Sequence, residues 1–220
     1  MLGDLHVALH AHPPCRSNVR CGTHRTSMST APHLGDDLPE LHTARLRLRS
    51  VEPVDAASTA ALVTPDVTAN LSTWPSPMTE GQALERILEA KRLEHRREAI
   101  NFAILDRARG TLFGWIGLIR TGERSGRLGY WLGSGFRGRG LMKEAATAAL
   151  PAAAGFLGVS EVVALTLPDN RPSLAVLHAL GFRSAGEEEF YFEIAAKSRM
   201  CLKFLWSAKQ KGLSATAPTD

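Results

Sequence analysis

The feature that most constrains the fold is a basic, glycine-rich turn within residues 129–145 that joins a strand-like segment to an alanine-rich helix pattern over Leu141–Leu157. Glycine permits positive φ angles and lets an anion approach the backbone closely. Arg137, Arg139 and Lys143 add positive charge around the start of the helix. Bare N–H groups in this setting are typical of phosphate sites, so the turn predicts a cradle for a diphosphate.

The composition indicates an ordinary folded domain. The chain has 220 residues, of which 44% are hydrophobic and 22% charged, which argues against bulk disorder and fibrous classes. No apolar run is strong enough for a membrane span, so we expect no membrane partner. The net charge of +4 suggests an anionic ligand, and because aromatics make up only 6% and do not interleave with basic residues, no nucleic-acid partner is expected.

The three cysteines form neither a metal pattern nor a disulfide framework, since Cys15 and Cys21 lie near the N-terminus and Cys201 lies far from both. We therefore expect no metal and a cytoplasmic location.

Three regions differ in pattern. Residues 1–40 are rich in Pro, Ser, Thr and His and show no apolar periodicity, so we expect a disordered N-terminal extension. Regular patterns run over residues 41–207, which predict one domain, and residues 208–220 are expected to form a flexible tail.

Within the domain the order of elements is mixed. Thr79 and Gln82 have capping-box spacing before a helix whose apolar stripe is predicted to be Leu84, Ile87 and Leu88. The expected strands cover 45–49, 101–105, 111–119, 127–132, 162–167 and 199–205, the last alone or in a pair; the expected helices cover 54–63, 79–98, 141–157 and 172–180, with a loop at 71–77. An antiparallel meander followed by one parallel crossover gives a mixed sheet whose strands part where the connection changes.

Motifs spread from about Leu41 to Trp206 carry a resemblance to a known family. They are TARLRLR at 43–49, WPSP at 74–77, GWIGL at 114–118, GYWL at 129–132, RGRG at 137–140 with EA at 144–145, NRPS at 170–173 and LGF at 180–182. With these the chain resembles a GNAT superfamily N-acetyltransferase and is most similar to the RimJ/RimL branch, which acetylates protein N-termini. The resemblance implies an α+β fold, an α/β/α sandwich whose mixed, mostly antiparallel sheet has six to seven strands, a splayed central parallel pair and about four helices.

The resemblance also implies acetyl-CoA as cosubstrate, held in the wedge between the strand before the glycine turn and the next parallel strand. By similarity, main-chain groups of Tyr130, Trp131 and Leu132 would meet the pantetheine arm. The diphosphate would be held by Arg137, Gly138, Arg139, Gly140, Leu141 and Met142.

The implied catalytic groups are few. Ser173 is the implied proton donor to the leaving thiolate, because Leu177 stands where many relatives have a tyrosine. Asn170 would lie in the same coenzyme site and also has the position of a helix cap. A neutral amine attacks the thioester directly, and a main-chain N–H near Leu132 would stabilise the oxyanion. An α-amino group, with a pKa of about 7.7 to 8.0, is substantially neutral near pH 7. A protein N-terminus is therefore the acceptor that least needs the enzyme to remove a proton before attack.

The acceptor side carries two further expectations. Trp74 lines the acceptor pocket or, alternatively, anchors its proline-rich loop. Arg127 stands where many relatives have a glutamate, so a general base is absent there, and Arg127 either attracts an acidic substrate or pairs on the sheet. A protein or peptide N-terminus and a small amine both remain possible acceptors, and the protein is expected to be a monomer or a homodimer.

Two other functions stay open at the level of sequence. The missing glutamate allows a catalytically idle acetyl-CoA sensor or interaction module. A literal Gly-x-Gly-x-x-Gly at Gly133, Gly135 and Gly138 allows an NAD(P)-binding module. That module is disfavoured because too few strands follow the motif, and because Glu161, the acidic residue about 20 positions on, opens a strand instead of ending one.

Overall fold

The computed structural model describes residues 40–208, so the expected N-terminal extension and C-terminal tail lie almost wholly outside the described residues. The elements follow in the order β1 (Leu41–His42), β2 (Leu46–Ser50), η1 (Pro53–Asp55), α1 (Ala56–Leu62), α2 (Pro65–Thr68), α3 (Glu80–His95), β3 (Ala99–Asp106), β4 (Leu112–Arg120), β5 (Ser125–Leu132), η2 (Ser134–Phe136), α4 (Leu141–Leu157), β6 (Glu161–Thr166), α5 (Arg171–Ala179), β7 (Arg183–Phe192) and β8 (Lys197–Ser207).

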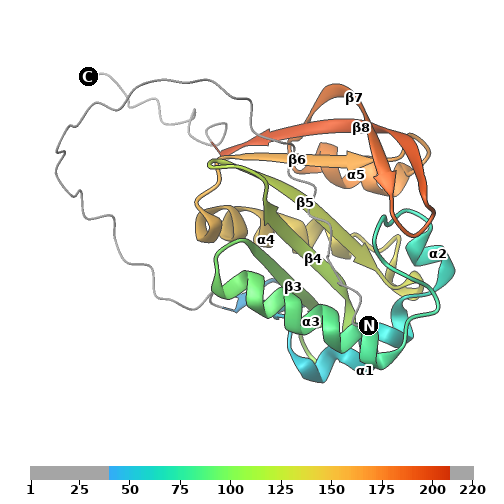
Figure 1. Ribbon diagram of the computed structural model, residues 1–220. Helices are drawn as coiled ribbons and strands as arrows, with labels where there is room; N and C mark the ends of the chain where they lie inside the picture. The colour runs from blue at the N-terminus through green and yellow to red at the C-terminus, as the bar shows by residue number, and fades with distance from the viewer. Residues whose placement is uncertain (1–39, 209–220) are drawn as a thin grey trace, which may run out of the picture. The chain divides into compact units, whose positions relative to one another are not determined.

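One sheet organises these elements. It has eight strands in the order β1-β2-β3-β4-β5-β6-β8-β7. All neighbouring pairs are antiparallel except β5 and β6, which are parallel and are joined through α4. Helices α1 and α3 lie on one face of the sheet and α4 lies on the other (Figure 1). This confirms the predicted three-layer α+β fold with a central parallel pair. The last strand is paired, as one alternative had it, with β7 beside β8, and the short edge strand β1 brings the sheet to eight strands where six to seven were expected.

Strand alternation divides the core into two layers. In β3, Ile100, Phe102 and Ile104 point into the layer beneath α4, whereas Ala103 and Leu105 point into the layer beneath α1 and α3. Every one of these side chains is buried. A strand that is buried on both faces explains why this segment reads as a nearly continuous apolar run.

Helix α3 begins as the sequence predicts and packs differently. Thr79 Oγ1 accepts the Gln82 N–H at 3.2 Å, and Gln82 Oε1 accepts the Thr79 N–H at 2.9 Å, which completes the capping box. The predicted stripe is wrong in part, because Leu88 is 44% exposed. The buried stripe is Ala83, Ile87 and Ala90, which lie four and three residues apart on one face.

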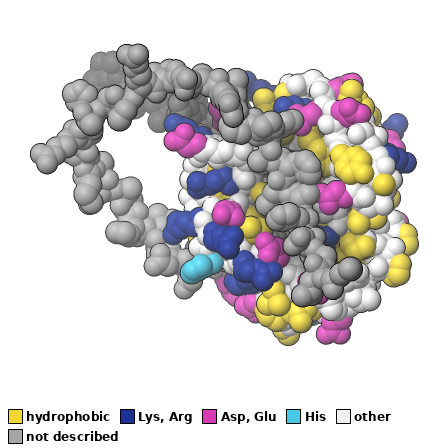
Figure 2. All heavy atoms as spheres, viewed as in Figure 1, with side chains coloured by type: hydrophobic (Ala, Val, Ile, Leu, Met, Phe, Trp, Pro, Cys, Tyr) yellow, Lys and Arg dark blue, Asp and Glu magenta, His cyan; other side chains and the backbone are white. Residues whose placement is uncertain are grey.

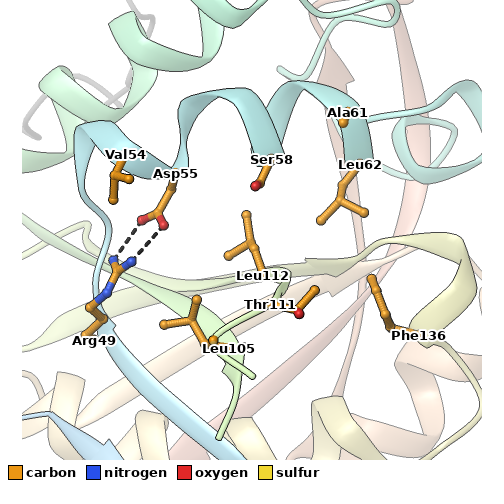
Figure 3. A pocket seen from close by; sticks show the side chains of 11 residues that line it. Arg49, Val54, Asp55, Ser58, Ala61, Leu62, Leu105, Thr111, Leu112 and Phe136 are labelled. Atoms are coloured by element: carbon orange, nitrogen blue, oxygen red, sulfur yellow. Dashed lines mark hydrogen bonds and ion pairs between the residues drawn. The ribbon is translucent and has the colours of Figure 1, made fainter. Parts of the chain in front are cut away.

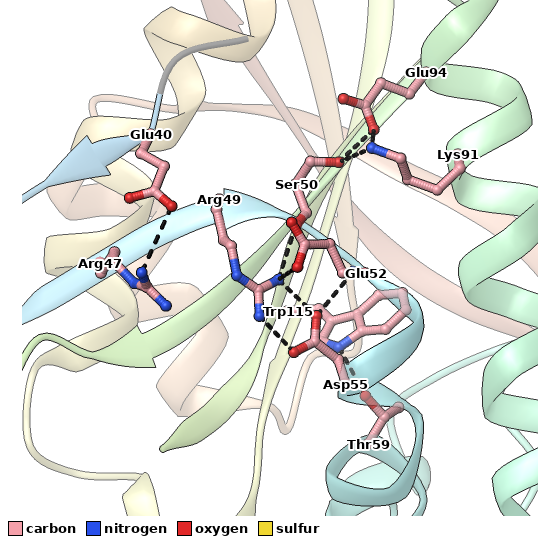
Figure 4. A network of polar contacts seen from close by, with 10 residues as sticks. All are labelled: Glu40, Arg47, Arg49, Ser50, Glu52, Asp55, Thr59, Lys91, Glu94 and Trp115. Atoms are coloured by element: carbon pink, nitrogen blue, oxygen red, sulfur yellow. Dashed lines mark hydrogen bonds and ion pairs between the residues drawn. The ribbon is translucent and has the colours of Figure 1, made fainter. Parts of the chain in front are cut away.

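A polar network fastens β2 and β4 to the first helical segments, η1 and α1 (Figure 4). The Arg49 guanidinium donates to both carboxylate oxygens of Asp55 at 2.8 Å each, and Asp55 is buried. Nearby, Trp115 Nε1 donates to Thr59 Oγ1 at 3.2 Å, which ties β4 to α1. Bidentate pairing satisfies the buried carboxylate, so the network sets how α1 sits on the sheet.

The exposed face of α3 carries charges of both signs. Arg92 pairs with Glu89 at 2.7 Å and Lys91 pairs with Glu94 at 3.0 Å. Figure 2 shows Lys and Arg side chains lying next to Asp and Glu on the visible face. Such a surface is typical of a solvated helix.

Candidate active site

Strand β5 is paired on both edges only at its start. It pairs with β4 from Gly126 to Leu132, but its pairing with β6 stops after Arg127. Beyond that point β6 continues beside β8 alone. The second half of β5 therefore has one unpaired edge, which faces the gap where the two parallel strands part.

The main-chain groups of Tyr130 and Leu132 face this gap. Gly133 donates its N–H to the Phe113 carbonyl at 2.9 Å, so these two residues form a hydrogen-bonded pair across β4 and β5. Hydrogen-bonded pairs alternate along an antiparallel ladder, so the main-chain N–H and C=O of Trp131 also point toward β4. Those of Tyr130 and Leu132 point away from β4. This differs from the sequence-based expectation, in which all three residues offered main-chain groups to the pantetheine arm.

The Trp131 side chain instead joins an aromatic cluster on the α1 and α3 face. Trp74 lies edge-on to both Trp131 and Trp115, with ring centroids 5.2 Å apart in each case. Arg86 stacks over the Trp74 ring at 4.8 Å. Trp131 Nε1 is buried and has no hydrogen-bond acceptor among residues 40–208. Trp74 is half-buried and fixes its loop to this cluster, which agrees with the anchoring alternative.

The glycine turn after β5 is exposed and leaves its N–H groups bare. Gly138 and Gly140 both have φ of +73°, a left-handed conformation that glycine adopts without strain. No side chain caps α4, and the first N–H of this region with a bond to the chain is that of Glu144, which donates to the Gly140 carbonyl at 3.1 Å. The N–H groups of residues 138–143 have no acceptor within the described part of the chain. This arrangement matches what an anion needs at a helix start.

The basic residues of the turn have different surroundings. Arg139 and Lys143 are exposed, and neither has an ion-pair partner within residues 40–208. Arg137, in contrast, donates to Asp66 Oδ2 at 3.3 Å and to the Leu132 carbonyl at 3.2 Å. Its side chain therefore braces the turn against α2, while its neighbours leave positive charge open to a ligand.

A hydroxyl pair lies where β5 meets α5. Asn170 caps α5, its Oδ1 accepting the Ser173 N–H at 3.3 Å. The Ser173 and Tyr130 hydroxyl oxygens lie 2.9 Å apart, close enough for a hydrogen bond in either direction. Burial raises the pKa of Tyr130 to about 12, so this hydroxyl stays protonated at neutral pH. The sequence pattern pointed only to the main chain of Tyr130 and missed its side chain.

Arg127 lies on the opposite face of β5 from this hydroxyl pair. Its guanidinium sits over the Phe190 ring at 5.3 Å, which joins β5 to β7. Gly129, the next residue on the same face, has no atom within 4 Å of where a Cβ would stand. The β7–β8 turn reaches the loop before α3, where Ile194 donates its N–H to the Ser72 carbonyl at 3.1 Å. Open space therefore lies beside a cationic side chain on this face.

A separate cavity of about 490 Å³ lies between α1 and the β3–β4 end of the sheet (Figure 3). The Arg49–Asp55 pair closes one end, and Leu62, Leu112 and Phe136 line the apolar part. Because its charges are already paired and it contains none of the predicted site residues, we assign it no part in the site. Within the described residues no His, Cys, Asp and Glu side chains group as metal ligands, and no helix there has the length and hydrophobicity of a bilayer span.

Comparison with known proteins settles the family. Residues 45–183 match the family model for the acetyltransferase (GNAT) domain. The chain belongs to the GNAT acetyltransferase family. It is 28% identical over 171 residues to the uncharacterized N-acetyltransferase p20 of Bacillus licheniformis, covering 76% of this chain and 94% of that protein.

Solved structures share the GNAT fold. The ribosomal-protein-S5-alanine acetyltransferase of Vibrio fischeri has a TM-score of 0.65 at 21% identity, covering 77% of this chain and 96% of that one. Mycobacterium smegmatis RimJ, solved in complex with CoA-disulfide, has a TM-score of 0.65 at 23% identity, covering 77% of this chain and 84% of that one. The predicted family and fold are thus confirmed.

Proposed function

We propose that this GNAT protein transfers an acetyl group from acetyl-CoA to a primary amine, most favourably the α-amino group of a protein or peptide. The observation that carries the proposal is the run of bare N–H groups at residues 138–143, which follows the unpaired edge of β5 after the short helix η2. A helix start of this kind binds a diphosphate, and a free strand edge binds an amide-containing arm. The CoA held by the RimJ neighbour contains both groups, which supports the assignment.

In this proposal the coenzyme contacts two groups of main-chain donors, one in the glycine turn and one on the edge of β5. The N–H groups of Gly138, Arg139, Gly140, Leu141 and Met142 bind the diphosphate, and the Arg139 and Lys143 side chains add charge. The main-chain groups of Tyr130 bind the pantetheine arm along the edge of β5. The Leu132 carbonyl accepts from Arg137, and the Leu132 N–H is left for the thioester oxygen. Asn170 borders the thioester end and keeps the start of α5 fixed through its bond to Ser173.

The proposed reaction is a direct transfer. The neutral amine nitrogen attacks the thioester carbonyl carbon, and the Leu132 N–H donates to the oxygen as it gains negative charge. The carbon–sulfur bond then breaks and Ser173 gives its proton to the departing sulfur. The amide nitrogen releases one proton to water, and Ser173 takes one proton back from water, so that the products are the amide and the free thiol. Because a thiol has a pKa of about 8.5, a hydroxyl that is itself hydrogen-bonded to Tyr130 is a sufficient donor.

The surroundings of Arg127 favour acceptors with an acidic group near the amine. The guanidinium has no ion-pair partner within residues 40–208 and lies beside the open space at Gly129. Trp74 and its cluster bound the same face of the sheet. Peptides with an acidic second or third residue should therefore be better acceptors than peptides with a basic residue there. Arg127→Glu should reverse this preference.

Thiol release from acetyl-CoA, measured with a panel of amines, tests the proposal. The panel holds N-terminal peptides, N-terminally blocked peptides with a free lysine, and small amines. We expect the N-terminal peptides to react fastest near pH 7, with a rate that rises through about pH 8 as the α-amine loses its proton. Acetyl-CoA binding without turnover on any acceptor would instead favour the idle sensor. A thermal shift with NAD or NADP in place of CoA would favour the dinucleotide-binding alternative.

A further inference from the structure

Arg45, at the corner before β2, contacts the start of α4 through several bonds. Its Nε and Nη2 both lie 2.7 Å from Glu144 Oε2, and its main-chain N–H donates to Glu144 Oε1 at 2.9 Å. Thr43 Oγ1 also donates to Glu144 Oε1, at 2.5 Å. Both oxygens of this carboxylate are therefore engaged by residues about a hundred positions earlier in the chain.

The same guanidinium also reaches into the glycine turn. Arg45 Nη1 donates to the Arg139 carbonyl at 3.0 Å. The peptide between Arg139 and Gly140 is trans, so the Gly140 N–H points away from the carbonyl and thus away from Arg45. That N–H has no acceptor among the described residues. Holding the carbonyl on one side therefore directs the N–H to the other.

We propose that Arg45, held by Glu144 and Thr43, is a positioning residue that keeps the glycine turn in its anion-binding shape before the coenzyme arrives. The proposal rests on the proposed function, because it assigns Arg45 a role in binding the diphosphate of CoA. Left-handed glycines at 138 and 140 make the turn adaptable, so a tether is what selects one of its shapes. Nothing in the sequence pattern places Arg45 next to Glu144.

Charge and geometry make opposite predictions at Glu144. If Arg45 and Glu144 acted only through their charges, removing the Glu144 carboxylate would make the site more positive and tighten CoA binding. If they act by holding the turn, Glu144→Gln frees Arg45 and weakens CoA binding. Arg45→Lys separates the two as well, because it keeps the charge but cannot bridge Glu144 and the Arg139 carbonyl.

The test is calorimetric binding of CoA and, separately, of S-acetylpantetheine, which lacks the diphosphate. We expect Glu144→Gln, Arg45→Lys and Arg45→Met each to weaken CoA binding by about 5- to 30-fold, with S-acetylpantetheine unaffected. The double variant Arg45→Met, Glu144→Gln should bind CoA no more weakly than the weaker-binding single variant, because both changes remove the same contact between Arg45 and Glu144. Arg92→Gln, which breaks the exposed Arg92–Glu89 pair on α3, is the matched control and should bind CoA as the wild type does.

The outcomes separate this inference from the function on which it rests. Failure of the wild type to bind CoA would overturn the proposed function itself. If the wild type binds CoA and Glu144→Gln binds it equally well or more tightly, the positioning role of Arg45 is overturned. The same holds if Arg45→Lys binds CoA as tightly as the wild type does. Equal losses for CoA and S-acetylpantetheine would also overturn it, since they would show a general structural defect.

Discussion

Helices α3 and α4 begin in opposite ways. Thr79 and Gln82 exchange hydrogen bonds at the start of α3, so the N–H groups of both residues have side-chain acceptors. Helix α4 begins at Leu141, and its N-cap Gly140 supplies no side-chain acceptor. The N–H groups of residues 138–143 have no acceptor within residues 40–208. A helix start with bare donors is costly unless water or a ligand supplies the acceptors. Under the proposed function, the start of α3 serves stability and the start of α4 serves binding.

The two starts also differ in how they are supported. Helix α3 is fixed by contacts within a single turn of chain, whereas the α4 start is held from outside by Arg45 and by the Arg137–Asp66 contact. Support from outside leaves the donors themselves unoccupied. A binding site can thus be rigid without being filled by its own side chains.

The largest effect is expected when α4 is given a cap of its own. In Gly140→Asp the carboxylate takes the place of the anion and repels the diphosphate, so CoA binding should weaken by more than about 100-fold, or about 2.7 kcal/mol. Calorimetry with CoA measures this. Gly135→Asp adds the same charge at an exposed glycine without a left-handed φ, and it should cost only a few-fold. Equal losses in the two variants would show that only charge matters.

The next effect concerns α5, where Asn170 caps the Ser173 N–H and the Ser173 hydroxyl pairs with that of Tyr130. Ser173→Ala should lower kcat by about 100-fold, because general acid catalysis is lost, while the Kd for CoA stays near its wild-type value. Tyr130→Phe removes the partner hydroxyl and should lower kcat by about 10-fold. Unchanged kcat in Ser173→Ala would remove Ser173 from the mechanism.

A smaller effect is expected at the start of α3. Thr79→Ala removes the capping hydroxyl and should lower the free energy of unfolding by about 1 kcal/mol. Thermal and denaturant unfolding measure this loss. The Kd for CoA should not change, and a clear change would mean that the two helix starts are not functionally distinct.

The smallest expected effect is the loss of stability at low pH that comes from Glu144. Burial alone would raise the pKa of Glu144, but the hydrogen bonds from Thr43 and Arg45 outweigh it, so the folded pKa is lowered. The carboxylate therefore makes its full contribution to the free energy of unfolding above its ordinary pKa of about 4.5. This contribution is lost as the pH falls through the lower pKa of the folded protein. The stability difference between wild type and Glu144→Gln should be constant near pH 7 and shrink below about pH 4.5. A difference that persists in acid would contradict this.

The sequence predicts the local parts of the site and the order of the elements. The glycine turn, the bounds of α4 and the Asn170 cap depend on residues close together in the chain, and each has the predicted form. Strand β7 is harder to predict because its Glu187–Glu189 run has no apolar alternation. It is held as an edge strand by pairing with β8.

The rest depends on contacts that no short motif contains. Arg45 meets Glu144 across 99 positions, and the Tyr130 hydroxyl meets Ser173 across 43. Which of Trp131 and Leu132 turns its main chain to the open edge of β5 depends on the register between β4 and β5. The sequence shows that these residues matter, but only the packed sheet assigns their directions.

Amide chemical shifts during a CoA titration test the central claim most directly. In ¹⁵N-labelled protein, the amides of Gly138 to Lys143 should show the largest shifts, moved downfield by new hydrogen bonds, while those of Thr79 to Gln82 at the start of α3 stay in place. Binding of CoA that leaves the residue 138–143 amides unmoved and shifts another surface would contradict the account.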